Sequence, residues 1–232
     1  ARYLLEGRDG ARFALEAAPH DPATGPLELL SAVDVGPALA DPPLYLRDRE
    51  SNYWFEHLPE SQTLFFQYNR CAEMESQPFA AFAGELFAVV DSQPVQRIVV
   101  DLRANGGGNS AIIRPFLNGL EERPALRERG RLFAIIGRGT FSSGMWNALD
   151  IKEMGGVLVG EPTGGRPNAY GETRRFRLPN SGLLVQVSTR YWQRLPGSDP
   201  PSVMPDLPVE LSMADYLAGR DAALEAILDY AP

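Results

Sequence analysis

Cysteine, lysine and histidine are scarce in this sequence of 232 residues, which contains one cysteine, one lysine and two histidines. The single cysteine, Cys71, excludes an internal disulfide and any metal site built from several thiolates. No apolar run comes near the roughly 18 residues that a membrane-spanning helix needs. The formal net charge of -8 leaves no basic stripe to hold phosphates. We therefore expect no metal, no cofactor, no membrane insertion and no nucleic-acid partner.

The same scarcity restricts the chemistry, because few side chains are left to act as a general base. All basic residues except Lys152 are arginines, whose guanidinium keeps its proton at neutral pH. The only imidazoles are those of His20, in a proline-rich stretch typical of a loop, and His57, at the end of an expected strand. The supply of plausible general bases in this chain is therefore very small.

The chain divides into two parts by composition. Two short strand-like runs, 3–5 and 12–16, precede a connector rich in proline and alanine at about 18–48. We expect residues 1–48 to be the end of an upstream β-rich unit plus a linker. Residues 49–232 are then expected to form the main domain.

Strand and helix patterns alternate through this main domain. Repeated strand–helix units indicate parallel strands covered by helices, which is an α/β fold. The expected strands are 52–58, 63–69, 97–102, 132–136 and 157–159, and the expected helices are 79–90, 112–120 and 143–154. A hairpin is expected at 174–178 and 183–191, and an amphipathic helical region at 213–230.

The run Gly137 to Gly144 joins a buried strand to a helix and contains Thr140, Ser142 and Ser143. Serines at a helix N-terminus lie beside backbone N–H groups that have no partner within the helix. Such a position suits a nucleophile whose product is an oxyanion. The alternative is that one of the three hydroxyl groups simply caps the helix.

Two more glycine-bearing segments follow strands. Asp101 to Asn109 contains Gly106, Gly107 and Gly108, which let backbone N–H groups approach a ligand without a side chain in the way. This suits an oxyanion hole or a phosphate cradle, although a tight turn is the alternative, and the Gly-Lys-Ser/Thr of a Walker loop is missing. Val159 to Asn168 is the third such segment. Loops after parallel strands meet at one edge of a sheet, so we expect the three to converge.

These segments together resemble the core of the S41 serine peptidases, the tail-specific, C-terminal-processing and tricorn-type proteases. The residues that carry the resemblance are Asp101–Gly108, Thr140–Ser143 and Gly160–Gly165, and it extends over about 50–228. It implies a crotonase-like (ClpP-like) β/α core with flanking β-hairpins and a C-terminal helix. It also implies Ser142 as nucleophile, with an oxyanion hole from the N–H groups of Ser143 and Gly107.

The sequence departs from this family at the general base. Many members place a lysine five residues after the glutamate of the Gly-Glu-Pro-Thr motif, and Arg166 stands there. Lys152 lies ten residues after Ser142 on the same expected helix, or about 15 Å along its axis, and is out of reach. We expect Arg166, with Gly106, to bind substrate or orient a loop.

Tricorn-like members use a histidine from a segment that precedes the core. We therefore expect this chain to be a C-terminal fragment of a longer enzyme whose base lies upstream, with His57 as the fallback base. Acidic residues that could orient a base are Glu172, Asp199 and Asp206, and the sequence does not choose among them.

The expected activity is hydrolysis of peptide bonds in a peptide or protein substrate, and family analogy favours the bacterial periplasm or cell envelope. The alternative is a non-catalytic module that binds a peptide or an apolar ligand on the same scaffold. Two further readings are an acyl-CoA enzyme with a similar oxyanion hole and a nucleophilic Cys71.

Overall fold

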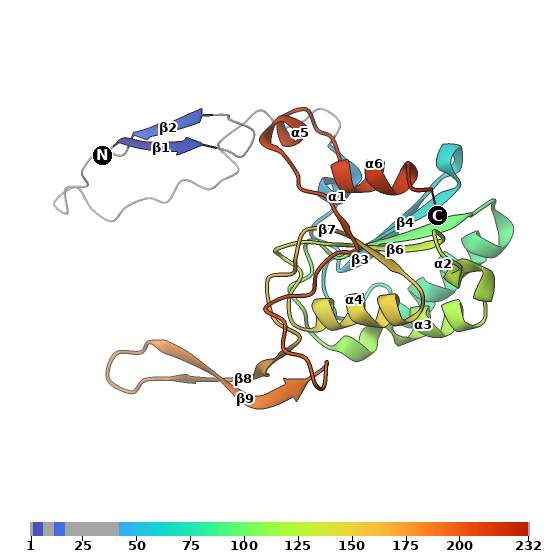
Figure 1. The fold of residues 1–232 in the computed structure, drawn as a ribbon. Helices are drawn as coiled ribbons and strands as arrows, with labels where there is room; N and C mark the ends of the chain where they lie inside the picture. Colours follow the sequence, from blue (N-terminus) through green and yellow to red (C-terminus); the bar gives the residue numbers. More distant parts are fainter. Residues whose placement is uncertain (1, 7–11, 17–41, 232) are drawn as a thin grey trace. The chain divides into compact units, whose positions relative to one another are not determined.

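A six-stranded, mostly parallel sheet is the centre of the computed structural model (Figure 1). The structure describes residues 2–6, 12–16 and 42–231. By their contacts the residues form two units, Asp48–Glu210 with Ala223–Pro232 and Ala1–Arg47 with Leu211–Ala222. The sheet belongs to the first of these units, and the mixed α/β architecture that the sequence predicts is confirmed.

The order of the strands in the sheet is β10-β7-β6-β5-β4-β3. Strand β3 runs antiparallel to β4 at one edge, and the other neighbours pair in parallel. The strands are β3 (Tyr53–Leu58), β4 (Thr63–Tyr68), β5 (Arg97–Asp101), β6 (Leu132–Ile136), β7 (Val157–Gly160) and β10 (Leu207–Pro208). Their apolar runs are almost fully buried because helices cover both faces.

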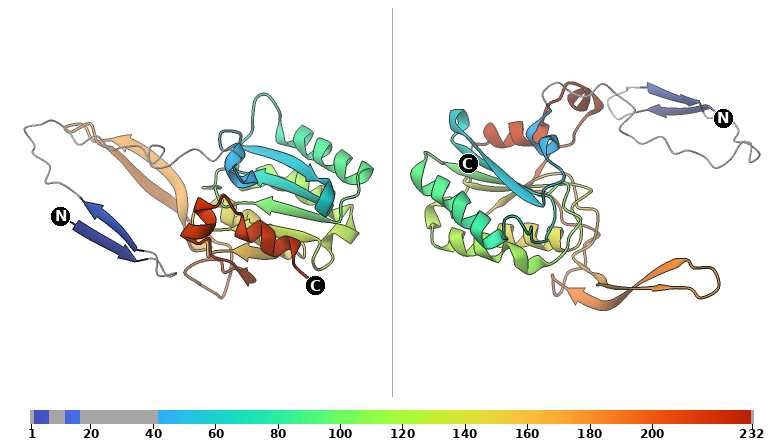
Figure 2. Two further views of the ribbon diagram at one scale, coloured as in Figure 1. Left: turned by 90° about the horizontal axis from the view of Figure 1, so that it is seen from above. Right: turned by 180° about the vertical axis from the view of Figure 1, so that it is seen from behind.

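Side chains alternate between the two faces of this sheet. On one face, Phe66 of β4 packs against Phe82 and Phe116, with ring centroids 5.2 Å away in each case. On the other face, Phe133 of β6 meets Tyr230 edge to face at 5.3 Å. The first face is covered by α2 (Phe79–Ser92), α3 (Arg114–Glu121) and α4 (Ser143–Glu153), and the second by α6 (Ala222–Leu228) (Figures 1 and 2).

Two helix predictions need correction. The segment 112–120 begins as a 3-10 turn, η4 (Ser110–Ile113), before α3 starts at Arg114. The segment 213–230 forms two helices, α5 (Met213–Leu217) and α6, because Gly219 at φ +69° ends the first one. Two further 3-10 turns are η3 (Pro59–Ser61), which joins β3 to β4, and η5 (Pro124–Arg127).

In the N-terminal part the structure describes two antiparallel strands, β1 (Arg2–Glu6) and β2 (Arg12–Glu16), and the short helix α1 (Leu44–Arg47). Both strands were expected. Most of the expected connector, including His20, lies outside the described residues, and the division at residue 48 stays a prediction.

Strands β8 (Asn168–Arg177) and β9 (Leu184–Gln193) form a separate two-stranded ribbon. Among the strands that the structure describes, they pair only with each other, and they extend away from the six-stranded sheet (Figures 1 and 2). The ribbon is longer than predicted, because pairing continues from Arg177–Leu184 down to Asn168–Gln193. No helix in the described part of the chain is both long and apolar enough to cross a membrane.

Candidate active site

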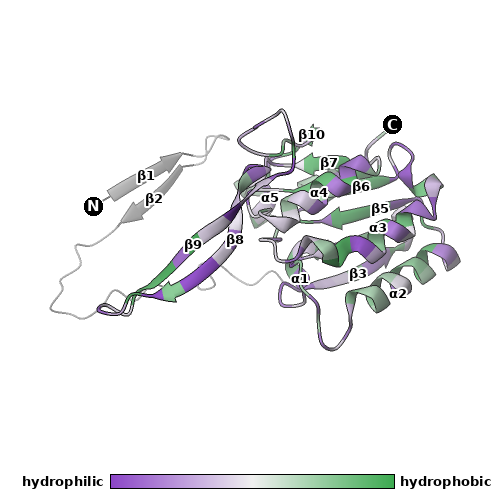
Figure 3. Cartoon of the chain, turned by 90° about the horizontal axis from the view of Figure 1, so that it is seen from below, coloured by the Kyte–Doolittle hydropathy of each residue, from purple (hydrophilic) through white to green (hydrophobic). Residues whose placement is uncertain are grey.

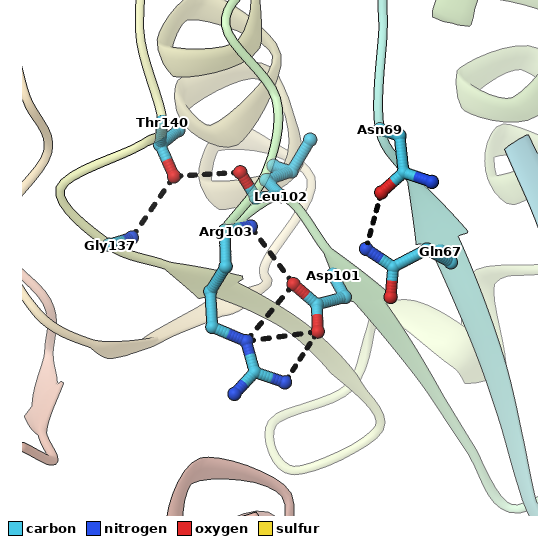
Figure 4. A network of polar contacts seen from close by, with 7 residues as sticks. All are labelled: Gln67, Asn69, Asp101, Leu102, Arg103, Gly137 and Thr140. Atoms are coloured by element: carbon cyan, nitrogen blue, oxygen red, sulfur yellow. Dashed lines mark hydrogen bonds and ion pairs between the residues drawn. The ribbon is translucent and has the colours of Figure 1, made fainter. Parts of the chain in front are cut away.

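The loops after β5, β6 and β7 meet at the end of the sheet where these parallel strands finish. The Thr140 hydroxyl donates to the carbonyl of Leu102 at 2.8 Å and accepts from the Gly137 N–H at 3.0 Å (Figure 4). The carbonyl of Thr140 in turn accepts from the Gly164 N–H at 3.0 Å. Thr140 therefore ties the three glycine-bearing loops together, and the expected convergence is confirmed.

A buried ion pair fixes the start of the first loop. Asp101, at the end of β5, is fully buried and pairs with the guanidinium of Arg103 at 2.5 Å. It also accepts the backbone N–H of Arg103 at 2.9 Å, so the chain turns immediately after the strand (Figure 4). Nearby, Gln67 donates to Asn69 at 2.9 Å at the end of β4. The ends of β4 and β5 therefore each carry their own set of polar contacts.

Ser142 has an unusual backbone conformation at the start of α4. Its φ is +50° and its ψ is -125°, a region that residues other than glycine rarely adopt. Such strain costs about 1–3 kcal/mol, and it persists only where the surroundings enforce it. Ser142 is exposed and occupies the N-cap position, yet its side chain makes no capping hydrogen bond.

None of the three candidate hydroxyl groups caps the helix. The Thr140 hydroxyl is engaged with Leu102 and Gly137, and the Ser143 hydroxyl donates to the carbonyl of Gly108 at 2.7 Å. The alternative reading of this run as a set of helix caps is therefore wrong. The N–H of Ser143 has no hydrogen-bond acceptor among the described residues.

The glycine loop lies directly against this turn. A Cβ atom on Gly107 would lie 2.7 Å from the Cβ of Ser142 and 3.1 Å from the nitrogen of Ser143. The φ of Gly107 is +106°, so both space and conformation require glycine here. Gly106 differs, because a Cβ there would have no neighbour within 4 Å.

The N–H of Gly107 is engaged, since it donates to Oδ1 of Asn105 at 2.9 Å. Asn105 is fully buried, and its Nδ2 donates to the carbonyl of Tyr68 at 2.9 Å. Its own carbonyl accepts the N–H of Phe141 at 2.9 Å. Asn105 thus connects the end of β4, the glycine loop and the serine turn.

A pocket of about 580 Å³ opens beside Ser142. Its walls include Trp146 of α4 and Trp192 of β9, whose rings meet edge to face at 5.2 Å. Arg166 and Glu172 also line it; Arg166 pairs with Asp199 at 3.3 Å and Glu172 with Arg190 at 3.4 Å. The structure therefore brings Arg166 and two of the three candidate acids to the Ser142 side of the sheet.

The third acid and the lysine lie elsewhere. Lys152, near the end of α4, pairs with Asp206 at 2.5 Å. Asp206 also accepts the N–H of Leu158 at 3.0 Å. The two residues join α4 to the chain before β10, and the prediction that Lys152 cannot reach Ser142 is consistent with their position.

The structure does not bring His57 to Ser142. His57 pairs with Leu64, which is in register with Ile98 and, through it, with Leu132 at the beginning of β6. Ser142 follows the opposite end of β6, so the two are about 13 Å apart along the strands alone. The fallback prediction was wrong because the antiparallel direction of β3 carries His57 away from the site. No other histidine is among the described residues.

Known proteases resemble this chain in sequence and in fold. The chain is 29% identical over 156 residues to the tricorn protease of Thermoplasma acidophilum, which covers 60% of this chain and 14% of that protein. Its fold is similar to that of mature CPAF, with a TM-score of 0.55, 12% identity and coverage of 97% and 65% of the two chains. The fold is also similar to that of a putative S41 protease from Bacteroides fragilis, with a TM-score of 0.50 and 14% identity. That match covers 82% of this chain and 58% of the other.

The resemblance to the S41 peptidases is confirmed. No protein-family model matches the sequence. The chain spans about a seventh of the length of the tricorn protease.

Cys71 sits behind the S41-like loops and is not placed as a nucleophile. It is buried, and its sulfur lies 3.4 Å from Oδ1 of Asn105 and 3.3 Å from Oδ1 of Asn147. Burial raises the pKa of the Cys71 thiol to about 11, so the thiol is protonated at neutral pH. The reading of Cys71 as a nucleophile is contradicted.

Sequence reasoning gave no role to Asn105 or to the two tryptophans of the pocket. Asn105 stands in the motif of the S41-like glycine loop, and an asparagine just before three glycines was the available signal. Trp146 and Trp192 are 46 positions apart in the sequence. Nothing local to either one indicated that they share a wall.

Proposed function

We propose that this chain carries the nucleophile and the oxyanion hole of a serine peptidase. The observation that supports it most is Ser142, which is exposed in a strained turn, makes no capping bond, and lies beside the open N–H of Ser143. Strained strand-to-helix turns that present a serine in this way recur in hydrolases. The sheet is assigned, as part of the same proposal, to the crotonase-like class.

In this mechanism the Oγ of Ser142 attacks the carbonyl carbon of the scissile peptide bond. The developing oxyanion accepts hydrogen bonds from the N–H groups of Ser143 and Gly107. For this, the hydrogen bond from the Gly107 N–H to Oδ1 of Asn105 must break, or the N–H must be shared between Oδ1 and the oxyanion. The tetrahedral intermediate then expels the amine and leaves an acyl group on Ser142, which water removes.

A base must take the Ser142 proton and later protonate the leaving amine. No lysine or histidine of the described residues lies within reach of Ser142, because Lys152 is committed to Asp206 and His57 lies at the other end of the sheet. We assign this role to a histidine from an upstream segment of a longer enzyme. A peptide or protein is the substrate class, and the relatives do not favour the alternative of a non-catalytic binding module.

The test is covalent labelling with a fluorophosphonate probe at several pH values. Ser142→Ala should abolish the labelling, whereas Ser110→Ala, which changes another serine of the same pocket, should retain it. Without a local base, the labelling rate should rise about tenfold per pH unit without a plateau near pH 7. Labelling that survives Ser142→Ala would contradict the proposal. A plateau near neutral pH would show that the chain supplies its own base.

A further inference from the structure

The outer half of the β8–β9 ribbon has one apolar face that no described residue covers. Phe176 lies opposite Val185 and Arg174 lies opposite Val187. Since side chains alternate along a strand, these four share a face, which Leu178 and Leu183 extend toward the tip. The exposed fractions are 49% for Phe176, 47% for Val187 and 64% for Leu183. Figure 3 shows the apolar colour at this outer end.

The ribbon also differs in charge from the rest of the molecule. Residues 168–193 contain four arginines and one glutamate, in a chain with a net charge of -8. Arg174 and Arg175 are exposed, and their guanidinium groups have no hydrogen-bond or ion-pair partner among the described residues. The outer ribbon therefore combines an apolar face with unpaired positive charge, which complements an acidic partner that also has apolar side chains.

The inner end of the ribbon is continuous with the pocket of Ser142. Tyr170, Thr173 and Ser188 line that pocket together with Ser142. A polypeptide that leaves the pocket along β8 reaches Arg174 directly after Thr173. No other described strand pairs with either outer edge of the ribbon, because β8 and β9 pair only with each other within this part of the chain. An extended chain can add to such an edge through its backbone.

We propose that the outer β8–β9 ribbon, residues 174–187, is a docking surface for the substrate polypeptide. The occupant is an extended segment with acidic and apolar side chains. The occupant adds to the edge of β8, so its side chains alternate between the two faces of the ribbon. Its acidic groups lie toward Arg175, on the face opposite the apolar one, and its apolar groups cover Phe176, Val185 and Val187, on the face that Arg174 borders. That this occupant is a substrate rests on the proposed peptidase function.

A second copy of the chain fits this surface less well. Face-to-face pairing of two ribbons by a two-fold axis would bring Arg174 of one copy toward the arginines of the other. The apolar face also has only five apolar side chains, whereas a standard interface uses about 20–30 residues on each side. Charge and size both favour an acidic extended chain.

The experiment measures binding by fluorescence anisotropy, with the full chain carrying Ser142→Ala so that nothing is cleaved. Three labelled peptides of equal length are compared: one with alternating glutamate and leucine, one with Glu replaced by Gln, and one with Glu replaced by Lys. The glutamate peptide should bind most tightly, and added salt should weaken it. Arg174→Gln with Arg175→Gln should weaken it by about fivefold and leave the glutamine peptide unchanged.

Two further variants separate the charge from the apolar face. Phe176→Ser should weaken both the glutamate and the glutamine peptides, and exposed Arg49 of the same structural unit provides the control Arg49→Gln, which should change nothing. Equal binding of the glutamate and glutamine peptides overturns the inference, and so does a dimer that Phe176→Ser converts to monomer in sedimentation. If the chain with Ser142 intact is not labelled at Ser142 by the fluorophosphonate probe, while glutamate-dependent binding is intact, the proposed function alone is overturned.

Discussion

The serine turn and the β8–β9 ribbon border the same pocket but are held in opposite ways. The serine turn is tied to buried Thr140 and Asn105, whose side chains bond to Leu102 and Gly107 of the glycine loop and to Tyr68 at the end of β4. Of the described residues, only those of β8 and β9 themselves hold the outer ribbon, through their ladder, and its large side chains are exposed. A two-stranded ribbon by itself is marginally stable in water. In the functions proposed above, the serine turn is the rigid part that holds the reacting groups, and the ribbon is the part that contacts the partner.

The largest expected effect comes from crowding the rigid part. Gly107→Ala places a methyl group 2.7 Å from the Cβ of Ser142, at a φ of +106°. The turn must shift, and the fluorophosphonate labelling rate should fall by about a hundredfold or more. Gly84→Ala, in α2 and outside the site, is the control, because a Cβ there also meets no atom within 4 Å. Equal labelling rates in the two variants would contradict the assignment of Gly107 to the oxyanion hole.

Next comes the loss of the residue that connects the loops. Asn105→Ala removes the bonds to Tyr68 and Gly107 and leaves the buried carbonyl of Tyr68 without that donor. The free energy of unfolding should fall by about 3 kcal/mol, measured by urea denaturation. Asn109 is exposed, and its side-chain Oδ1 accepts the Ala111 N–H, so Asn109→Ala should cost about 1 kcal/mol or less. Similar losses in both would mean that Asn105 does not hold the loops together.

A pH effect should come from the buried thiol behind the loops. The pKa of Cys71 is raised from 9.0 to about 11 by burial. Above pH 9 the unfolded chain releases this proton while the folded chain retains it, so stability is complete below pH 9 and falls as the pH rises toward 11. The loss is on the order of 2 kcal/mol.

The measurement compares urea denaturation of the wild type and of Cys71→Ala between pH 8 and 11. Only the wild type carries the titrating group, so its stability relative to the variant should decrease over this range. A constant difference between the two proteins would show that Cys71 is accessible to water in the folded state.

The smallest effect should come from the ribbon. Phe176→Ala should change the free energy of unfolding by about 0.5 kcal/mol or less, because Phe176 packs on no core residue. Phe66→Ala, in the fully buried core, should cost about 3–5 kcal/mol. Urea denaturation of the two variants tests the contrast between the regions directly. A large loss for Phe176→Ala would show that the ribbon is part of the stable core.

Much of the fold could be predicted because its signals are local. The apolar runs at 97–101 and 132–136 and the helical spacing after Ser143 depend only on neighbouring residues. The division of 213–230 into two helices was missed, since the apolar period continues across Gly219. The length of β8 and β9 was also missed, because exposed strands show no apolar alternation that marks their ends.

The sequence by itself determined that three glycine-bearing loops follow strands of one parallel sheet, and that Ser142 and Ser143 stand at a helix start. Only the tertiary structure decided which groups in these loops are free. The Thr140 hydroxyl donates to Leu102, and the Gly107 N–H donates to Asn105. The Ser143 N–H has no acceptor among the described residues, and His57 lies at the opposite end of the strands. The physical reason is that strand direction and register set which distant segments meet, whereas sequence patterns report only on residues a few positions apart.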